Sequence, residues 1–216
     1  MKVGFHTFPS GKQYTYVRPD GEPGPIFLRN ILFLTPTNDV RTIAIVCEMG
    51  SRGGAGTWEP PKGQMEWKEF ADSGFKSGVR IAPADLLKYM RRGALREMTE
   101  EAKVLPSEIT GLRRLPLAYS QAWPESKVAG AAFMYQFWHA TLKPGAMVEA
   151  QKRLAALMSN PDWIKMLPPD MCEKQAVRWW NPVRGDDPKL IRGAFSNKMT
   201  RMYYAFLENN KLSSRA

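Results

Sequence analysis

Three glutamates, Glu97, Glu100 and Glu101, lie close together directly after Arg96. They fall in a proline-free stretch, residues 84–105, in which apolar residues recur at roughly helical spacing: Leu87, Ala94, Met98 and Ala102. This pattern predicts a helix. At about 100° per residue, the three carboxylates then fall within an arc of roughly 100° beside the apolar stripe.

Carboxylates at these spacings repel one another. Glu97 stands three residues before Glu100 and four before Glu101. Like charges so placed destabilise an isolated helix by about 0.2–0.5 kcal/mol per pair. A bound divalent cation removes the repulsion, and ligands that are all oxygen favour Mg²⁺ or Mn²⁺ over zinc. The alternative is a solvated acidic helix face, which is the commoner origin of such a string taken alone.

The preceding loop favours the metal site. Residues 58–63 read Trp-Glu-Pro-Pro-Lys-Gly, and Glu69 follows Gly63 after five residues. With the helix, this resembles the Nudix hydrolase signature G-x5-E-x7-R-E-U-x-E-E-x-G-U, where U is a bulky apolar residue. The chain departs from it twice: 26 residues separate Glu69 from Arg96 in place of seven, and Lys103 stands where the family has a helix-ending glycine.

The resemblance implies a role for each matching residue. Glu97, Glu100 and Glu101 would bind the metal, together with the backbone carbonyl near Gly63. Glu97 would also orient or deprotonate the attacking water. Three further residues would support the site or the substrate: Arg96 orients a carboxylate, Glu69 is a secondary ligand or a partner of Arg96, and Lys62 contacts a substrate phosphate.

The general base is left open, since in this family it often lies outside the signature. The candidates are Glu125, Glu149 and Glu173, and for each of them an ordinary surface glutamate is the competing interpretation. Several aromatic residues are candidates for stacking on a base, with core packing as the default: Trp67, Tyr119, Trp123, Trp179 and Trp180. We interpret His139 as a structural histidine within a strand.

Charge and composition narrow the class of protein. The net charge is +10 although the predicted helix is acidic, so basic residues dominate elsewhere and favour a polyanionic partner such as RNA. No apolar run is long enough for a membrane span, and the N-terminus lacks the apolar core of a signal peptide. Cys47 and Cys172 are far apart and suit a reducing, cytoplasmic environment, which would be the host cytoplasm for a viral protein.

The elements that position these residues alternate between strand and helix, which predicts an α/β fold. The resemblance implies a Nudix-like α/β/α sandwich with a mixed sheet, built as one domain over residues 1–216. We expect an irregular N-terminal extension over 1–25 with at most one short hairpin, and insertions at about 70–83 and 143–170. Strands are predicted at 31–35, 42–47, 109–117, 130–142 and 174–180. Residues 146–159 are predicted as a helix, 119–126 as a loop, 161–169 as a linker, and 189–209 as a basic C-terminal helix.

Three functional hypotheses follow from the residues and the resemblance. The first is a metal-dependent hydrolase that cleaves a phosphoanhydride bond in the 5′ cap of mRNA and releases a nucleoside diphosphate. The late strand with its tryptophan, followed by a basic aromatic helix, is similar to decapping-type Nudix enzymes of large DNA viruses. The second is a hydrolase of dinucleoside polyphosphates or diphosphoinositol polyphosphates. The third is a non-catalytic RNA-binding module on a Nudix scaffold, against which the intact carboxylates argue.

Overall fold

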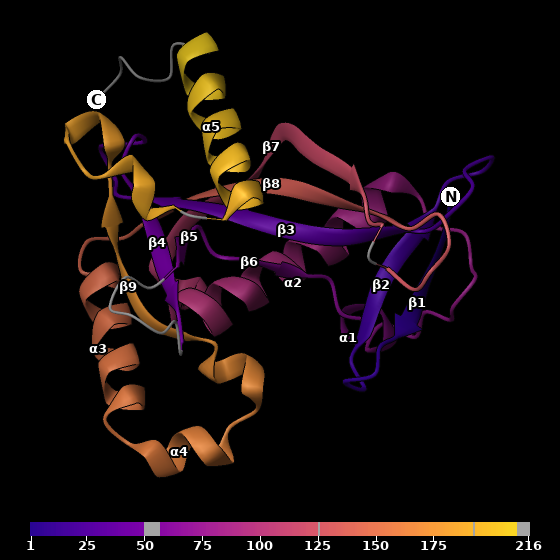
Figure 1. Cartoon of the computed structure of the whole chain (residues 1–216), viewed down its shortest axis with the longest axis horizontal. Helices are drawn as coiled ribbons and strands as arrows, with labels where there is room; N and C mark the ends of the chain where they lie inside the picture. Colours follow the sequence, from indigo (N-terminus) through magenta and orange to yellow (C-terminus); the bar gives the residue numbers. More distant parts are fainter. Residues whose placement is uncertain (50–56, 125, 192, 211–216) are drawn as a thin grey trace. The chain divides into compact units, whose positions relative to one another are not determined.

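The computed structural model describes residues 1–49, 57–124, 126–191 and 193–210 (Figure 1). The chain divides into two compact units. Unit 1 comprises Met1–Ile31, Lys62–Arg96 and Ala118–Phe137, and unit 2 comprises Leu32–Pro61, Glu97–Leu117 and Trp138–Ala216. The organisation as one domain stays a prediction, whereas the α/β class is confirmed by the strands and helices that each unit contains.

Unit 1 is built on antiparallel strand pairs. Its strands are β1 (Lys2–Thr7), β2 (Gln13–Arg18), the start of β3 (Ile26–Thr35), β6 (Lys62–Gln64), the start of β8 (Ala132–Leu142) and the end of β7 (Ile109–Ala122). The strand order is β1-β2-β3-β8-β7, with β6 paired to β3. β1 and β2 pair from Lys2↔Arg18 to Thr7↔Gln13. The short hairpin that was allowed for residues 1–25 is present, but the expectation of an irregular extension is wrong, because the hairpin is regular and joins the sheet through β2 and β3.

The helices of unit 1 are α1 (Lys68–Ala71) and the first part of α2 (Pro83–Ala102). The buried stripe of α2 repeats every four residues and comprises Leu86, Met90, Ala94, Met98 and Ala102, all at most 6% exposed. The helix was predicted correctly, although Leu86 rather than Leu87 is buried. Gly93 lets the side chain of Met65, the residue after β6, come close, because a Cβ at this position would lie 2.3 Å from Met65 Sδ. This close approach accounts for a glycine in a helix interior, where it costs about 1 kcal/mol relative to alanine.

The first insertion is mainly exposed, as expected for a surface loop, but its first residue is not. Phe70 is fully buried and packs against Trp67 and Tyr89 with ring centroids 5.5 and 4.3 Å away. The insertion is therefore attached to unit 1 by an aromatic contact.

Unit 2 contains a second antiparallel sheet in the order β5-β4-β9. Its strands are β4 (Ile43–Glu48), β5 (Trp58–Glu59) and β9 (Lys174–Trp180), and its α-helices are α3 (Ala146–Met158), α4 (Pro161–Met166) and α5 (Ala194–Asn209). Its described residues also form four short 3₁₀ helices: η1 (Pro106–Glu108), η2 (Pro169–Cys172), η3 (Pro182–Arg184) and η4 (Pro188–Leu190). The end of α2 and parts of β3, β7 and β8 belong to this unit as well. The predicted β4, β8 and β9 and the predicted α3 are confirmed.

The largest differences from the prediction concern β7, α4 and α5. β7 runs on to Ala122 where a loop was expected. The expected linker contains α4, which has Asn160 as its N-cap and Pro161 at its first position. α5 begins at Ala194 rather than at residue 189, because Pro188 to Leu190 forms a separate 3₁₀ turn. Among the described residues, no helix is both long and apolar enough to cross a membrane.

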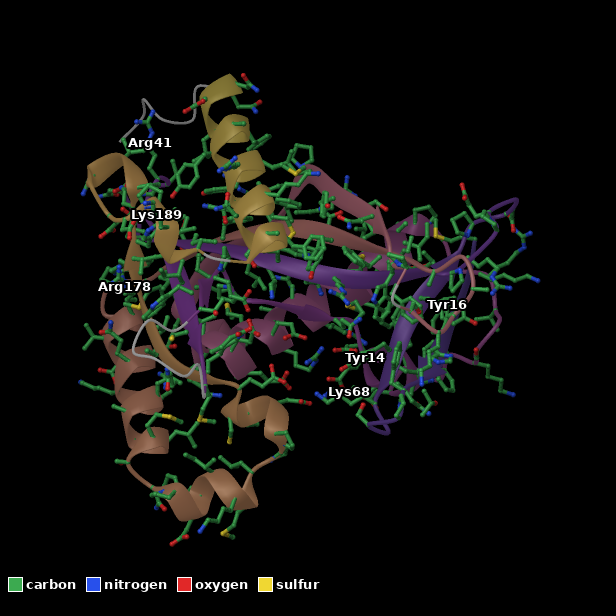
Figure 2. All side chains as sticks on the ribbon, viewed as in Figure 1. Tyr14, Tyr16, Arg41, Lys68, Arg178 and Lys189 are labelled. Carbon is green, nitrogen blue, oxygen red and sulfur yellow. The ribbon has the colours of Figure 1, made fainter. Side chains whose placement is uncertain are left out.

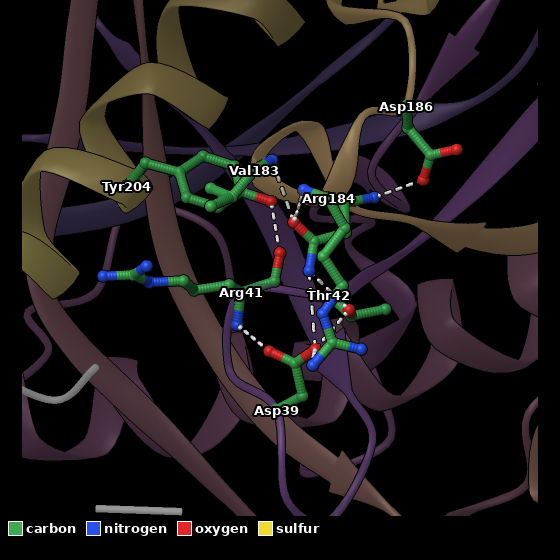
Figure 3. A network of polar contacts seen from close by, with 8 residues as sticks. Asp39, Arg41, Thr42, Val183, Arg184, Asp186 and Tyr204 are labelled. Atoms are coloured by element: carbon green, nitrogen blue, oxygen red, sulfur yellow. Dashed lines mark hydrogen bonds and ion pairs between the residues drawn. The ribbon is translucent and has the colours of Figure 1, made fainter. Parts of the chain in front are cut away.

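A polar network in unit 2 joins the turn before β4 to the end of β9 (Figure 3). Asp39 accepts hydrogen bonds from the Arg41 amide at 3.0 Å and from Thr42 Oγ1 at 2.7 Å, and it pairs with Arg184 at 3.1 Å. Burial raises the pKa of Asp39, but these hydrogen bonds and the Arg184 charge outweigh it and leave the pKa lowered. Tyr204 of α5 donates to the Arg41 carbonyl at 2.7 Å, which attaches α5 to the same turn.

Candidate functional site

Two of the three predicted ligands on α2 are buried. Glu97 is 7% exposed and Glu101 is 4% exposed, whereas Glu100 is half-buried. All three lie in unit 2, on the last turns of α2. Burial next to Met98 and Ala102 follows from the predicted position of the acids at the edge of the apolar stripe. Carboxylates are rarely buried to this degree without a partner, so the groups that face them decide what this end of α2 can do.

One buried lysine joins Glu101 to a glutamate that is distant in the sequence. Lys174 Nζ lies 3.1 Å from Glu101 Oε1 and 2.9 Å from Glu59 Oε1. The other oxygen of Glu59 accepts a hydrogen bond from Ser196 Oγ at 2.9 Å. Burial lowers the pKa of Lys174, but the charges of Glu101 and Glu59 outweigh this and raise it above the usual value, so Lys174 is an ammonium. Lys174, Glu59 and Glu101 form what we call the Lys174 cluster.

The helix ends on a lysine in the left-handed conformation. Lys103 directly follows α2 and has a φ of 56°. Glycine normally takes this position, since a side chain there is strained. Lys103 Nζ donates to the carbonyls of Glu100 at 2.5 Å and Met171 at 2.6 Å. These two bonds compensate for the strain and satisfy a carbonyl at the helix end that has no partner within the helix.

Arg96 joins the signature loop to α2 within unit 1. Its Nε donates to Glu69 Oε1 at 2.6 Å, and its Nη1 lies 3.3 Å from Glu66 Oε1. Its Nη2 donates to the Gln64 carbonyl at 2.8 Å, so the guanidinium also fixes the loop backbone. Burial raises the pKa of Glu69 more than Arg96 lowers it. Arg96, Glu66, Glu69 and the Gln64 carbonyl form what we call the Arg96 cluster.

Glu66 also binds a second cation. Lys68 Nζ lies 2.9 Å from Glu66 Oε2, and the backbone of Glu66 forms a bridge with Tyr14 of β2. Figure 2 labels Lys68 and Tyr14 among the side chains of this unit. The start of the first insertion is thus held against the N-terminal hairpin inside unit 1.

The two remaining predicted residues, Lys62 and Gly63, lie on β6 of unit 1. Lys62 is opposite Ile31 and Gly63 is opposite Asn30 in the pairing with β3. Both are half-buried. Their roles as a phosphate contact and as a carbonyl ligand stay predictions.

The three carboxylates of Glu97, Glu100 and Glu101 on α2 are of the ligand type that a hard divalent cation prefers. They offer oxygen ligands only, at positions i, i+3 and i+4 of one helix, and Mg²⁺ and Mn²⁺ prefer such ligands. Across the described residues, no group of three or more Asp, Glu, His or Cys side chains converges in a way that could hold a metal ion. The side chains of Glu97, Glu100 and Glu101 would therefore have to turn toward one another to bind one. The metal role of these residues stays a prediction.

The candidates for the general base fall in different environments. Glu149 is an exposed residue of α3 that pairs with Lys152 at 2.8 Å. Glu173 is exposed and lines a cavity in unit 2. Glu125 lies outside the described residues.

Most of the candidate stacking residues belong to the core or to other contacts. Trp67, Tyr119 and Trp180 are buried, at most 8% exposed. Trp123 is half-buried, and the guanidinium of Arg29 lies 5.4 Å from its ring. Trp179 is half-buried and lines shallow cavities near the turn before β4.

His139 is the structural histidine that we expected. It is 5% exposed, and its Nε2 lies 3.2 Å from Thr35 Oγ1. Burial lowers its pKa to about 4, so the ring is neutral at pH 7.

Sequence reasoning missed Glu59, Glu66 and Lys174. Glu59 follows Trp58 in the segment 58–63 that precedes the signature, but nothing in the sequence indicated that it pairs with Lys174. Lys174 opens β9 and is separated from Glu59 by 115 positions. A buried ion pair over such a distance leaves no local pattern in the sequence, which is why only the structure reveals it.

No family model matches this chain, and no curated protein matches it in sequence. The chain is similar to several solved structures. One is an Ap4A hydrolase of C. elegans, with 17% identity over 85% of this chain and 99% of that chain and a TM-score of 0.44. Another is a Nudix hydrolase of Nitrosomonas europaea, with 16% identity over 93% and 90% of the two chains and a TM-score of 0.43.

A pyrophosphohydrolase of Bacillus subtilis is similar at 11% identity over 97% of this chain and 99% of that chain, with a TM-score of 0.44. TM-scores below 0.5 do not establish a shared fold. The family therefore remains a proposal that depends on the signature residues and on the surroundings of the carboxylates.

Proposed function

We propose that this protein is a Nudix-type hydrolase that cleaves a phosphoanhydride bond in a nucleoside-diphosphate-linked substrate, with Mg²⁺ or Mn²⁺ as its cofactor. The observation that supports this most directly is the burial of Glu97 and Glu101 on consecutive turns of α2, in the sequence context of the Nudix signature. A solvated acidic face, the competing interpretation, would leave such carboxylates exposed.

In the proposed reaction, a water oxygen bonds to one phosphorus atom, the bridging P–O bond breaks, and the bridging oxygen leaves with the other phosphate. A proton of the water passes to a carboxylate, and Glu97 is our candidate for orienting this water. The metal, when bound, neutralises the charge of the diphosphate oxygens and makes the water more acidic. Glu97, Glu100 and Glu101 would hold it, with the carbonyl of Gly63 as the further ligand that the signature implies.

The other residues position the reacting groups. Arg96 holds Glu69 and the carbonyl of Gln64, which fixes the end of β6, the strand that carries Lys62 and Gly63. Lys62 is our candidate for the contact with a substrate phosphate. Lys174 orients Glu101 by an ion pair at 3.1 Å and so limits where this carboxylate can point.

We further propose that the substrate is the 5′ cap of mRNA. The net charge of +10, in a chain whose proposed active site is acidic, supports a large anionic substrate. Dinucleoside polyphosphates and diphosphoinositol polyphosphates are the competing substrates with the same reactive bond.

A panel of substrates tests both parts of the proposal. The protein is incubated with Mg²⁺ or Mn²⁺ and, in parallel, with capped RNA, diadenosine tetraphosphate or an inositol pyrophosphate. Release of a nucleoside diphosphate from capped RNA is expected. Turnover of the small polyphosphates alone would overturn the cap assignment, and no product from any substrate would favour the RNA-binding module.

Matched variants of α2 test the site itself. Glu100→Gln is expected to abolish turnover without changing thermal unfolding, because Glu100 is half-buried and lies outside the Lys174 cluster. Asp85→Asn is the control, since Asp85 is likewise a half-buried carboxylate, lies in the first turn of the same helix and pairs with Lys88 at 2.8 Å. Full activity of Glu100→Gln would remove this residue from the proposed metal site.

The salt dependence of RNA binding tests the docking surface. If RNA phosphates bind to basic side chains, the logarithm of the association constant for RNA should fall steeply and linearly with the logarithm of the salt concentration. A flat salt response would contradict an electrostatic docking face.

A further inference from the structure

Unit 2 has a cavity that borders the Lys174 cluster. Its volume is about 620 Å³, within the range of small-molecule sites. Its lining includes α4 and the segment after it (Ile164, Lys165 and Leu167), and also the end of β4 (Glu48), the residue before β9 (Glu173) and the first residue of β9 (Lys174). The second insertion of the chain therefore supplies part of this lining.

Lys174 connects the cavity to the proposed reaction centre. It lines the cavity, and its ammonium pairs with Glu101 at 3.1 Å and Glu59 at 2.9 Å. A group bound in the cavity would thus be separated from a proposed metal ligand by a single side chain. A ligand in the cavity would therefore contact the residue whose ammonium holds Glu101 in place.

The lining combines an apolar face with hydrogen-bond acceptors. Ile164 and Leu167 offer apolar surface for the flat face of a ring. Glu48 and Glu173 carry carboxylates, which when ionised only accept hydrogen bonds. Guanine presents two adjacent N–H donors, N1–H and the N2 amino group, whereas adenine presents an acceptor nitrogen beside its amino group. The acceptor chemistry of the wall therefore favours guanine over adenine.

Lys165 adds a positive charge to the wall formed by the insertion. It is an exposed lysine that pairs with Asp162 at 3.1 Å, and both side chains of this pair are mostly in water. Exposed pairs of this kind are weak, so Lys165 can exchange Asp162 for a substrate phosphate at little cost.

We propose that this cavity binds the guanine nucleotide of the substrate next to the cleaved bond. The proposal rests on the proposed function and deepens it: the insertion around α4 selects a guanosine polyphosphate, and Glu173 with Glu48 reads the base.

Binding of the product nucleotides tests the cavity without requiring turnover. GDP and ADP are titrated in magnesium buffer into the wild-type protein and into three variants, and Kd is measured by calorimetry. We expect GDP to bind at least about tenfold more tightly than ADP, as a hydrogen bond to a charged group allows. Glu173→Gln should narrow this ratio severalfold, whereas Lys165→Glu should weaken both nucleotides by about tenfold.

Lys152→Glu is the matched control for Lys165→Glu. Lys152 of α3 is likewise exposed and pairs with an acid three residues earlier, Glu149, at 2.8 Å, but it does not line the cavity. Its variant should bind both nucleotides as the wild type does. Because Glu173 and Lys165 are exposed, thermal unfolding of their variants should remain unchanged, which confirms that a change in Kd reflects binding.

The outcomes separate this proposal from the proposed function. Equal binding of GDP and ADP, unaffected by either variant, would overturn the guanine site even if capped RNA is hydrolysed. The expected Kd pattern with no turnover of any substrate would support the guanine site and overturn the hydrolase. In the hydrolytic assay, a preference for diguanosine tetraphosphate over diadenosine tetraphosphate that narrows in Glu173→Gln, while both substrates are still turned over, would support both proposals and would remove Glu173 from the candidates for the general base.

Discussion

The Arg96 cluster of unit 1 and the Lys174 cluster of unit 2 each place one cation between two carboxylates. They differ in burial. In the Arg96 cluster the side chains are 15% exposed for Arg96 and Glu66 and 6% for Glu69. In the Lys174 cluster no side chain exceeds 5%. Ion pairs gain strength as water is excluded, but the desolvation of each ion costs more as well.

The choice of cation matches this difference. Arg96 uses its planar fork to hold two carboxylates and a backbone carbonyl at once, which fixes the shape of the loop. Lys174 is a point charge between two acids in the interior, where its main effect is to make their burial possible. We infer that the first cluster determines loop geometry and the second determines whether unit 2 is stable.

Removal of the interior cation should have the largest effect. Lys174→Met leaves Glu59 and Glu101 buried without their common cation, which should lower the free energy of unfolding by about 3–5 kcal/mol. Urea denaturation measures this change. Lys152→Met, which removes an exposed cation, should change the same quantity by less than about 1 kcal/mol. If both variants lower the free energy of unfolding by similarly small amounts, the buried ion pairs of Lys174 stabilise unit 2 no more than an exposed pair does.

A second interior group of unit 2 should make stability depend on pH. The pKa of His139 is lowered by burial from 6.5 to about 4. Between these values the unfolded chain binds a proton that the folded chain does not, so stability is full above pH 6.5 and is lost as the pH falls toward 4. The loss attributable to His139 should reach about 3 kcal/mol. Comparison of wild type with His139→Gln by denaturation at pH 7 and pH 4.5 isolates it, and parallel pH profiles would refute it.

The Arg96 cluster should respond less strongly. Arg96→Lys keeps the charge but cannot bind both carboxylates and the Gln64 carbonyl together. We expect a loss of about 2 kcal/mol in stability, as for hydrogen bonds that involve charged groups, and a lower kcat/KM because the loop is less well fixed. Urea denaturation and the hydrolytic assay measure the two effects. A variant that keeps full kcat/KM would show that Arg96 does not position the loop for catalysis.

The smallest effect should come from the end of α2. Lys103→Ala keeps the strained φ and loses the two hydrogen bonds of Nζ, whereas Lys103→Gly loses the bonds but relieves the strain. The glycine variant should therefore be more stable than the alanine variant by about 1 kcal/mol. If the two variants unfold at the same denaturant concentration, the left-handed residue carries no strain.

Local patterns predicted the elements that depend on local spacing. The stripe of α2 placed Glu97 and Glu101 at the edge of the core, and the aromatic run of β8 was read correctly as a strand. The α4 helix was missed because Pro161 was interpreted as a break, although proline suits the first position of a helix that Asn160 caps. The start of α5 was misplaced because basic and apolar residues continue upstream through the η4 turn.

Contacts between distant parts of the sequence could not be predicted in this way. The register that pairs Lys174 with Glu59 depends on the packing of β9 against β4, and nothing near Lys174 in the sequence indicates it. The same holds for Glu66, whose partner Arg96 lies beyond the first insertion. The roles assigned to the signature residues came from a family resemblance and stay predictions until the variants are measured.

The lysine that ends α2 bears on how such sites are sought in other chains. A search pattern that demands glycine after the last acidic turn would pass over any protein in which an ammonium, anchored on two carbonyl oxygens, takes over the reversal of the backbone. A pattern that accepts either glycine or lysine at that position, and still requires all the glutamates, would recover such chains. It would be less selective at that one position only.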